Sequence, residues 1–240
     1  MNDLHLLAAY EPVVKYTQGE LFFPAAVDVY VESCSLWELS PSRQRRQLAA
    51  PGELTIEKLG MLPEPQAGST YFLRFQQQPL GARDYQRWRQ RPEQPDFRAA
   101  GRLARVGIAS RVISSLFNFS LLVRGSVPGG TAAAAEIAAR QMRNADPRYV
   151  YYGRVLRQGG YTILHYVFFF AMNDWRSSFY GINDHEADWE QCFIYLVDGP
   201  NQQLVPRWVA FASHDYSGDD LRRRWDDPDL TLVDDGLCKL

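Results

Sequence analysis

The sequence has few cysteines and almost no excess of charge. Its three cysteines, Cys34, Cys192 and Cys238, lie far apart and form no Cys-x-x-Cys pair, so neither a disulfide framework nor a zinc ribbon is indicated. The 26 basic residues against 28 acidic residues leave a formal net charge of −2, which argues against a dedicated nucleic-acid binder. A phosphate-binding loop and a Gly-x-Gly-x-x-Gly motif are also missing.

Long hydrophobic runs are missing as well. The longest uncharged stretch, residues 158–173, is shorter than the ~20 apolar residues of a membrane-spanning helix and contains glycine, asparagine and histidine. The first residues have no basic start, and Glu11 interrupts them before an apolar core of signal-peptide length develops. We therefore expect a cytoplasmic protein without a transmembrane helix, either free or peripheral at a membrane.

What is present is a core-forming composition with β patterning at both ends. The chain of 240 residues is 46% hydrophobic and 13% aromatic, which suits a sizeable core and excludes intrinsic disorder. Short alternating or β-branched runs predict strands, and residues 40–65 predict a long surface loop. The expected strands are residues 13–16, 27–31, 71–75, 149–156, 161–171, 191–197 and 204–213. Turn residues at 157–160 predict a hairpin, and 215–240 looks loop-like.

These runs predict a mainly β (α+β) fold, a single β-sandwich-like domain over residues 1–240, with a helical insertion at 83–145. Residues 83–124 hold nine arginines and three acidic residues, and 99–123 has helical spacing. Thr131 is the expected N-cap of a second helix over 132–143. The basic helix has two alternatives. Either it packs on the sandwich with its arginines in water, or it rests on an anionic membrane through Arg98, Arg102, Arg105 and Phe117.

The segment richest in chemistry is residues 183–190, Asn-Asp-His-Glu-Ala-Asp-Trp-Glu. If a strand begins at Asp188, then Asp188 and Glu190 share one face, while Trp189 points the other way into packing. His185 lies three residues earlier and would fold back over that face. One imidazole and two carboxylates suit a divalent cation, with Ca²⁺ or Mg²⁺ favoured by the oxygen ligands and Mn²⁺ or Zn²⁺ by the histidine.

Asp174 and His214 each follow an expected strand end and would complete such a cation site. The alternative is structural. An acidic loop before a strand is commonly just solvated, and His214 would then be a hydrogen-bonded histidine at a strand end.

Residues 185–190 resemble the His-Glu-Gly-Asp-Trp-Glu signature of the vacuolar protein sorting-associated protein 62 family. They are also similar to the Gly-His-Arg-His-Asp-Trp-Glu heptad of the necrosis- and ethylene-inducing-peptide-like proteins. Residues 10–14 and 22–27 resemble the first family's opening Tyr-x-Pro and Phe-x-Pro-x-x-Val pattern. In total, the resemblance covers residues 8–32 and 148–216.

The resemblance implies a β-sandwich and a divalent cation, Ca²⁺ or Mg²⁺. It implies His185, Asp188 and Glu190 as ligands, with Asp174 as an approximate match to a further aspartate. Related sandwiches continue beyond the strand that ends in Ser-His. This chain ends 26 residues after His214, so we expect a truncated copy, or an open sheet edge that favours a homo-oligomer.

Three functions follow from these observations. The favoured one is a metal-dependent binding module for an anionic lipid, a glycolipid or a glycan. The second is a metal-assisted hydrolase, in which the cation activates water, Glu190 or Glu186 is the base and His214 is the acid. The third is a truncated structural remnant.

Overall fold

The computed structural model describes residues 2–16, 18–91, 129–174, 184–200, 203–212, 222–228, 230–233 and 237–238. The chain divides into two compact units. The first contains Met1–Tyr16, Val150–Phe169 and Trp189–Leu240, and the second contains Thr17–Tyr149 and Phe170–Asp188. In the described part of the chain, no helix is long and apolar enough to cross a membrane.

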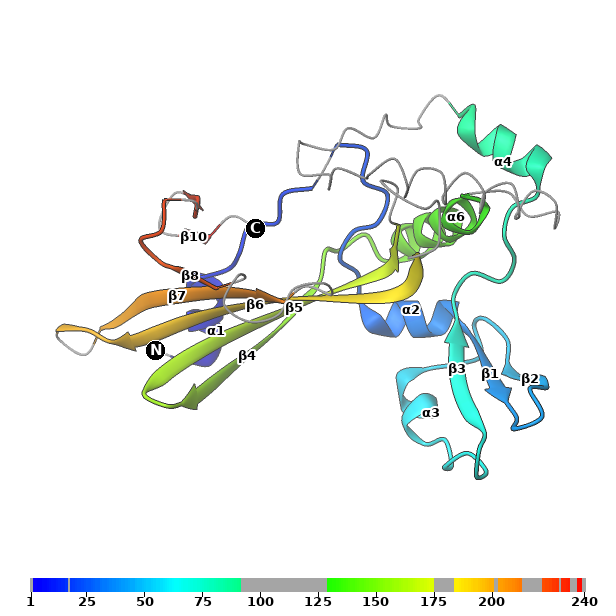
Figure 1. The fold of residues 1–240 in the computed structure, drawn as a ribbon, viewed down its shortest axis with the longest axis horizontal. Helices are drawn as coiled ribbons and strands as arrows, with labels where there is room; N and C mark the ends of the chain where they lie inside the picture. Colours follow the sequence, from blue (N-terminus) through cyan, green and yellow to red (C-terminus); the bar gives the residue numbers. More distant parts are fainter. Residues whose placement is uncertain are drawn as a thin grey trace, which may run out of the picture. The chain divides into compact units, whose positions relative to one another are not determined.

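The first unit is organised around a five-stranded sheet of order β4-β5-β6-β7-β8 (Figure 1), in which the strands pair antiparallel. The strands are β4 (Tyr151–Gln158), β5 (Tyr161–Asn173), β6 (His185–Asp198), β7 (Leu204–Ala212) and β8 (Arg222–Arg224). Residues 170–173 at the end of β5 and residues 185–188 at the start of β6 are counted in the second unit. Two short strands, β9 (Leu232–Val233) and β10 (Leu237–Cys238), pair with each other.

The β4–β5 hairpin forms where the sequence predicts it. Gln158 pairs with Tyr161, which leaves Gly159 and Gly160 as a two-residue turn with φ of 61° and 80°. Two consecutive positive φ values match the twist of the flanking strands, and glycine adopts them without steric cost. The register of this hairpin is therefore set by local sequence.

Helix α1 (Asp3–Ala9) packs against the hairpin. Asn2 caps its N-terminus, and the buried Leu6 and Leu7 form its inner face. The hydroxyl of Tyr166 donates to the carbonyl oxygen of Leu7 at 2.9 Å. Gly153 makes the close approach possible, because a Cβ there would lie 3.0 Å from the Leu7 side chain.

The second unit contains a three-stranded antiparallel sheet of order β2-β1-β3 and four described helices (Figure 1). The strands are β1 (Ser35–Leu39), β2 (Arg45–Ala49) and β3 (Thr70–Arg74), and the helices are α2 (Val27–Ser33), α3 (Ile56–Gly60), α4 (Ala82–Arg89) and α6 (Gly130–Ala145). A buried polar contact joins α4 to α6: Glu136, only 2% exposed, accepts from Trp88 Nε1 at 2.8 Å and from Arg140 Nε at 2.9 Å.

The chain is therefore a mixture of helices and antiparallel sheets, and most of the expected strands are confirmed. Strands β3, β4, β5, β6 and β7 fall on the predicted runs, and α6 contains the predicted helix over 132–143. The expected loop at 40–65 holds β2 and α3, and the expected loop at the C-terminus holds β8, β9 and β10.

Three local predictions are wrong. Residues 27–31 form helix α2 and not a strand, because Val27, Tyr30 and Val31 also have the i, i+3, i+4 spacing of a helix face, and Tyr30 and Val31 are buried on it. Residues 13–16 form no regular strand. The helix expected to be capped by Thr131 begins at Gly130, with Gly129 at the N-cap in the left-handed region.

Candidate functional site

The segment predicted to carry chemistry forms the start of β6, which begins at His185 and not at Asp188. Ala187 has a φ of 62°, a left-handed conformation that is unusual for a residue with a side chain. Asp188 is buried at 5% exposure, whereas Trp189 is 44% exposed. The prediction that Trp189 is packed away is therefore wrong in part. Its ring lies 4.7 Å from that of Phe169, centroid to centroid, but much of its surface meets solvent.

His185 and Asp188 approach each other as expected, with 4.0 Å between Nε2 and Oδ1. Across the described ranges, however, no group of three or more His, Cys, Asp or Glu side chains is arranged to hold a metal ion. The assignment of Glu190 and Asp174 as further ligands stays a prediction. The remaining predicted residues, His214, Arg98, Arg102, Arg105 and Phe117, lie outside the described residues.

Glu186 has a role that the sequence does not reveal. Its two carboxylate oxygens accept hydrogen bonds from the backbone N–H groups of Phe75, at 2.7 Å, and Gln76, at 2.9 Å. The carboxylate thus holds the chain just after β3, more than a hundred residues away in sequence. Burial, with a smaller contribution from the charge of Glu186, raises the pKa of the Cys34 thiol to about 12. The partners of Glu186 are backbone amides, so no side-chain pattern could have predicted them.

The segment that Glu186 holds lines a groove of about 850 Å³ within the second unit. The groove contains amide side chains and small residues from α6, and among its described lining residues Glu32 is the one that carries a charge. Its lining includes four glutamines, Gln76, Gln77, Gln78 and Gln141, and three alanines of α6, Ala134, Ala138 and Ala145.

Two neighbouring glutamines of this groove differ in how their amides are used. Gln77 is satisfied: its Oε1 accepts from Ser35 Oγ at 2.8 Å, and its Nε2 donates to the Arg74 carbonyl oxygen at 2.9 Å. Gln76 is 6% exposed, and among the described residues its Nε2 has no hydrogen-bond partner. A buried amide donor without an acceptor is unusual in a folded protein and requires an explanation.

The polar residues nearest the middle of β5 form a second cluster, which is structural. His165 Nδ1 accepts from Arg154 Nε at 2.9 Å, and its Nε2 lies 2.7 Å from Gln191 Oε1. The ring stacks on Phe193, with 4.2 Å between centroids. Burial lowers the pKa of His165, and the nearby Arg154 charge lowers it further although the Gln191 contact opposes this. The imidazole is thus held neutral, with all its polar atoms engaged.

Comparisons with known proteins give no relative from which a function can be transferred to this chain. No protein-family model, no curated protein and no solved structure matches the chain.

Proposed function

We propose that this chain is a binding module for a neutral, hydroxyl-rich ligand such as a glycan, which occupies the groove beside the segment held by Glu186. The observation that carries the proposal is the Gln76 amide, whose buried Nε2 has no acceptor in the described part of the chain. A buried donor left unsatisfied costs about 1–3 kcal/mol, and a ligand hydroxyl in the groove would accept its hydrogen bond once the amide turns toward the groove that Gln76 lines.

The lining favours this class of ligand over a charged one. A primary amide donates through its nitrogen and accepts through its oxygen, which matches the mixed donor and acceptor character of sugar hydroxyls. The alanines of α6 offer a flat apolar surface for the C–H face of a sugar ring. The charged group that the described lining offers is the carboxylate of Glu32, which repels a phosphate or sulfate group.

The cation implied by the resemblance remains a prediction. The described residues supply the pair His185 and Asp188 and not a set of three, so no step of the proposed binding passes through a metal ion. The hydrolase has less support than the binding module, because Glu186 is engaged with two backbone amides and is a poor candidate for a base.

Kinship with the vacuolar protein sorting-associated protein 62 family, and the β-sandwich that it implies, are part of the proposal. Ala187 stands where that signature has glycine, and it adopts the left-handed φ that glycine accommodates without strain. The antiparallel sheets of the chain are compatible with a sandwich.

The test compares Gln76→Leu with Gln77→Leu in the full chain. A panel of soluble neutral oligosaccharides is titrated by calorimetry, and stability is measured by urea unfolding. Gln76→Leu should abolish oligosaccharide binding while leaving the free protein as stable as the parent, or more stable by about 1 kcal/mol, since it removes an unsatisfied donor. Gln77→Leu should destabilise the protein, because its amide is fully used.

Two results would overturn the proposal. One is a panel in which no oligosaccharide binds the parent. The other is unchanged binding by a folded Gln76→Leu variant.

A further inference from the structure

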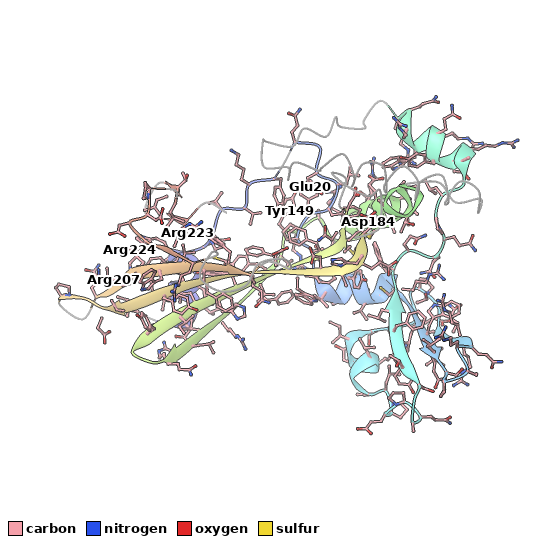
Figure 2. The ribbon with its side chains drawn as sticks, in the orientation of Figure 1. Glu20, Tyr149, Asp184, Arg207, Arg223 and Arg224 are labelled. Carbon is pink, nitrogen blue, oxygen red and sulfur yellow. The ribbon has the colours of Figure 1, made fainter. Side chains whose placement is uncertain are left out.

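A second surface lies in the first unit, at the edge of the five-stranded sheet formed by β7 and β8. All three residues of β8 are arginines, and they pair with β7 so that Arg224 lies opposite Trp208 and Arg222 opposite Ala210. Figure 2 shows Arg207, Arg223 and Arg224 gathered along this edge. Among the described residues of this edge, four arginines, Arg207 and Arg222–Arg224, stand beside two aspartates, Asp226 and Asp227.

Two of these arginines, Arg207 and Arg224, line a pocket of about 270 Å³. Its lining alternates cations with indole rings: Pro206, Arg207, Trp208, Arg224, Trp225 and Asp226. The backbone N–H of Trp225 donates to the Arg207 carbonyl oxygen at 2.9 Å, which fixes the chain after β8 against β7. The pocket is therefore built from paired backbone and not from a free loop.

Asp226 already occupies the position of an anion in this pocket. Arg224 holds it through a two-pronged contact, Nε to Oδ1 at 2.8 Å and a terminal nitrogen to Oδ2 at 2.9 Å. This hydrogen bond lowers the pKa of the Asp226 carboxyl, and the charge of Arg207 contributes further. The side chains of Arg224 and Asp226 are 67% and 71% exposed, so their attraction is weak and an external anion can replace the carboxylate.

The tryptophans indicate which anion this edge suits. The guanidinium of Arg222 lies over the ring of Trp208, 5.3 Å from its centroid, so that ring face is not open to stack on a nucleobase. Trp225 makes an edge contact with Tyr10, 6.3 Å between centroids. Indole rings set among arginines are typical of protein surfaces that sit at lipid headgroups.

We propose that the β7–β8 edge binds the phosphate groups of an anionic lipid surface, with Arg207 and Arg224 as the phosphate contacts and Asp226 as the internal competitor. In the sequence-based membrane hypothesis, the arginines of the predicted basic helix were the lipid contacts. Here the arginines of the β7–β8 edge, which are described residues, take that role. The proposal does not depend on the groove of the second unit, so either one can fail without the other.

The experiment is co-sedimentation of the full chain with vesicles of phosphatidylcholine alone or mixed with phosphatidylserine. The parent should bind only the mixed vesicles, and added salt should weaken the binding by screening. Arg207→Ala and Arg224→Ala should each weaken it about fivefold, the usual contribution of one arginine near an anionic surface. Asp226→Asn should strengthen it, because the internal competitor loses its charge.

The matched controls are two single variants, Arg148→Ala and Asp146→Asn. This pair makes the same two-pronged contact, at 2.8 and 2.6 Å, and its arginine is also largely exposed, but it lies in the second unit. The control variants should bind the mixed vesicles as the parent does. Inorganic phosphate and a single-stranded oligonucleotide are added as competing probes.

Several results would overturn the proposal. They are equal binding to both kinds of vesicle, unchanged binding by folded Arg207→Ala and Arg224→Ala variants, loss of binding in the control variants, or tighter binding of either soluble probe than of the vesicles. Circular dichroism establishes that each variant is folded before its binding is compared.

Discussion

Replacing Glu186 by glutamine tests the contact that links the acidic segment at the start of β6 to the chain just after β3. The carboxylate accepts from two backbone N–H groups, at 2.7 and 2.9 Å, and their residues Phe75 and Gln76 are 2% and 6% exposed. Glutamine keeps one acceptor and turns an NH₂ group toward the other N–H. The variant thus loses one charge-assisted hydrogen bond and leaves one buried donor unsatisfied, a cost of about 3 kcal/mol.

Urea unfolding measures this loss, and hydrogen exchange at the Phe75 and Gln76 amides locates it. The comparison variant is Glu20→Gln, because Glu20 also accepts from two backbone N–H groups, those of Leu21 and Phe22, at 2.8 and 3.1 Å. Both bonds end on one oxygen, Oε1, and glutamine keeps such an acceptor, so this variant should lose at most about 1 kcal/mol. The reasoning is refuted if Glu186→Gln unfolds within about 0.5 kcal/mol of the parent and exchange at the two amides is unchanged.

Three further predictions concern the start of β6 and the sheet. Ala187→Gly should stabilise the protein by about 0.5–1 kcal/mol, because glycine relieves a left-handed backbone at φ 62°. Arg43→Gly, at φ 60°, is the comparison variant. A loss of stability in thermal melts of Ala187→Gly would contradict this prediction. The pKa of His165 is lowered in the folded chain, so the unfolded chain binds more protons just below pH ~6.5. The free energy of unfolding should therefore fall as the pH decreases through that window. Urea unfolding of His165→Gln should show a smaller decrease. If the cation of the resemblance binds, Ca²⁺, Mg²⁺, Mn²⁺ or Zn²⁺ should raise the melting temperature of the EDTA-treated parent and not of Asp188→Asn, whereas equal shifts in both would remove Asp188 from the site.

Local signals account for most of the strands and for one helix. Gly159 and Gly160 predict a two-residue turn because few other residues adopt two positive φ values in succession, and the β4–β5 hairpin forms there. The alanine-rich run in α6 predicts a helix through its high intrinsic propensity. Residues 27–31 fit both a strand and a helix, and burial of Tyr30 and Val31 on one face decided for the helix.

The site depended much more on tertiary structure. The sequence alone placed His185 and Asp188 on the same short segment, and they do approach each other. In the hydrolase alternative it offered Glu190 or Glu186 as the base, but the Glu186 carboxylate holds two backbone amides that lie more than a hundred residues earlier. Backbone N–H groups are present at nearly every position, so a sequence cannot indicate which of them a carboxylate will meet.

The groove of the second unit and the β7–β8 edge likewise combine features that are visible in the sequence with features that only folding produced. The three consecutive arginines of β8 are plain in the sequence, but their meeting with Arg207 and Trp208 comes from the pairing of β8 with β7. The unsatisfied amide of Gln76 could not be foreseen, because Gln76 and Gln77 are chemically identical neighbours. Composition and period indicated most of the strands and helix α6, since those depend on neighbouring residues. Which polar atoms found partners was decided only when distant segments packed together, because hydrogen bonding depends on position in space and not on order along the chain.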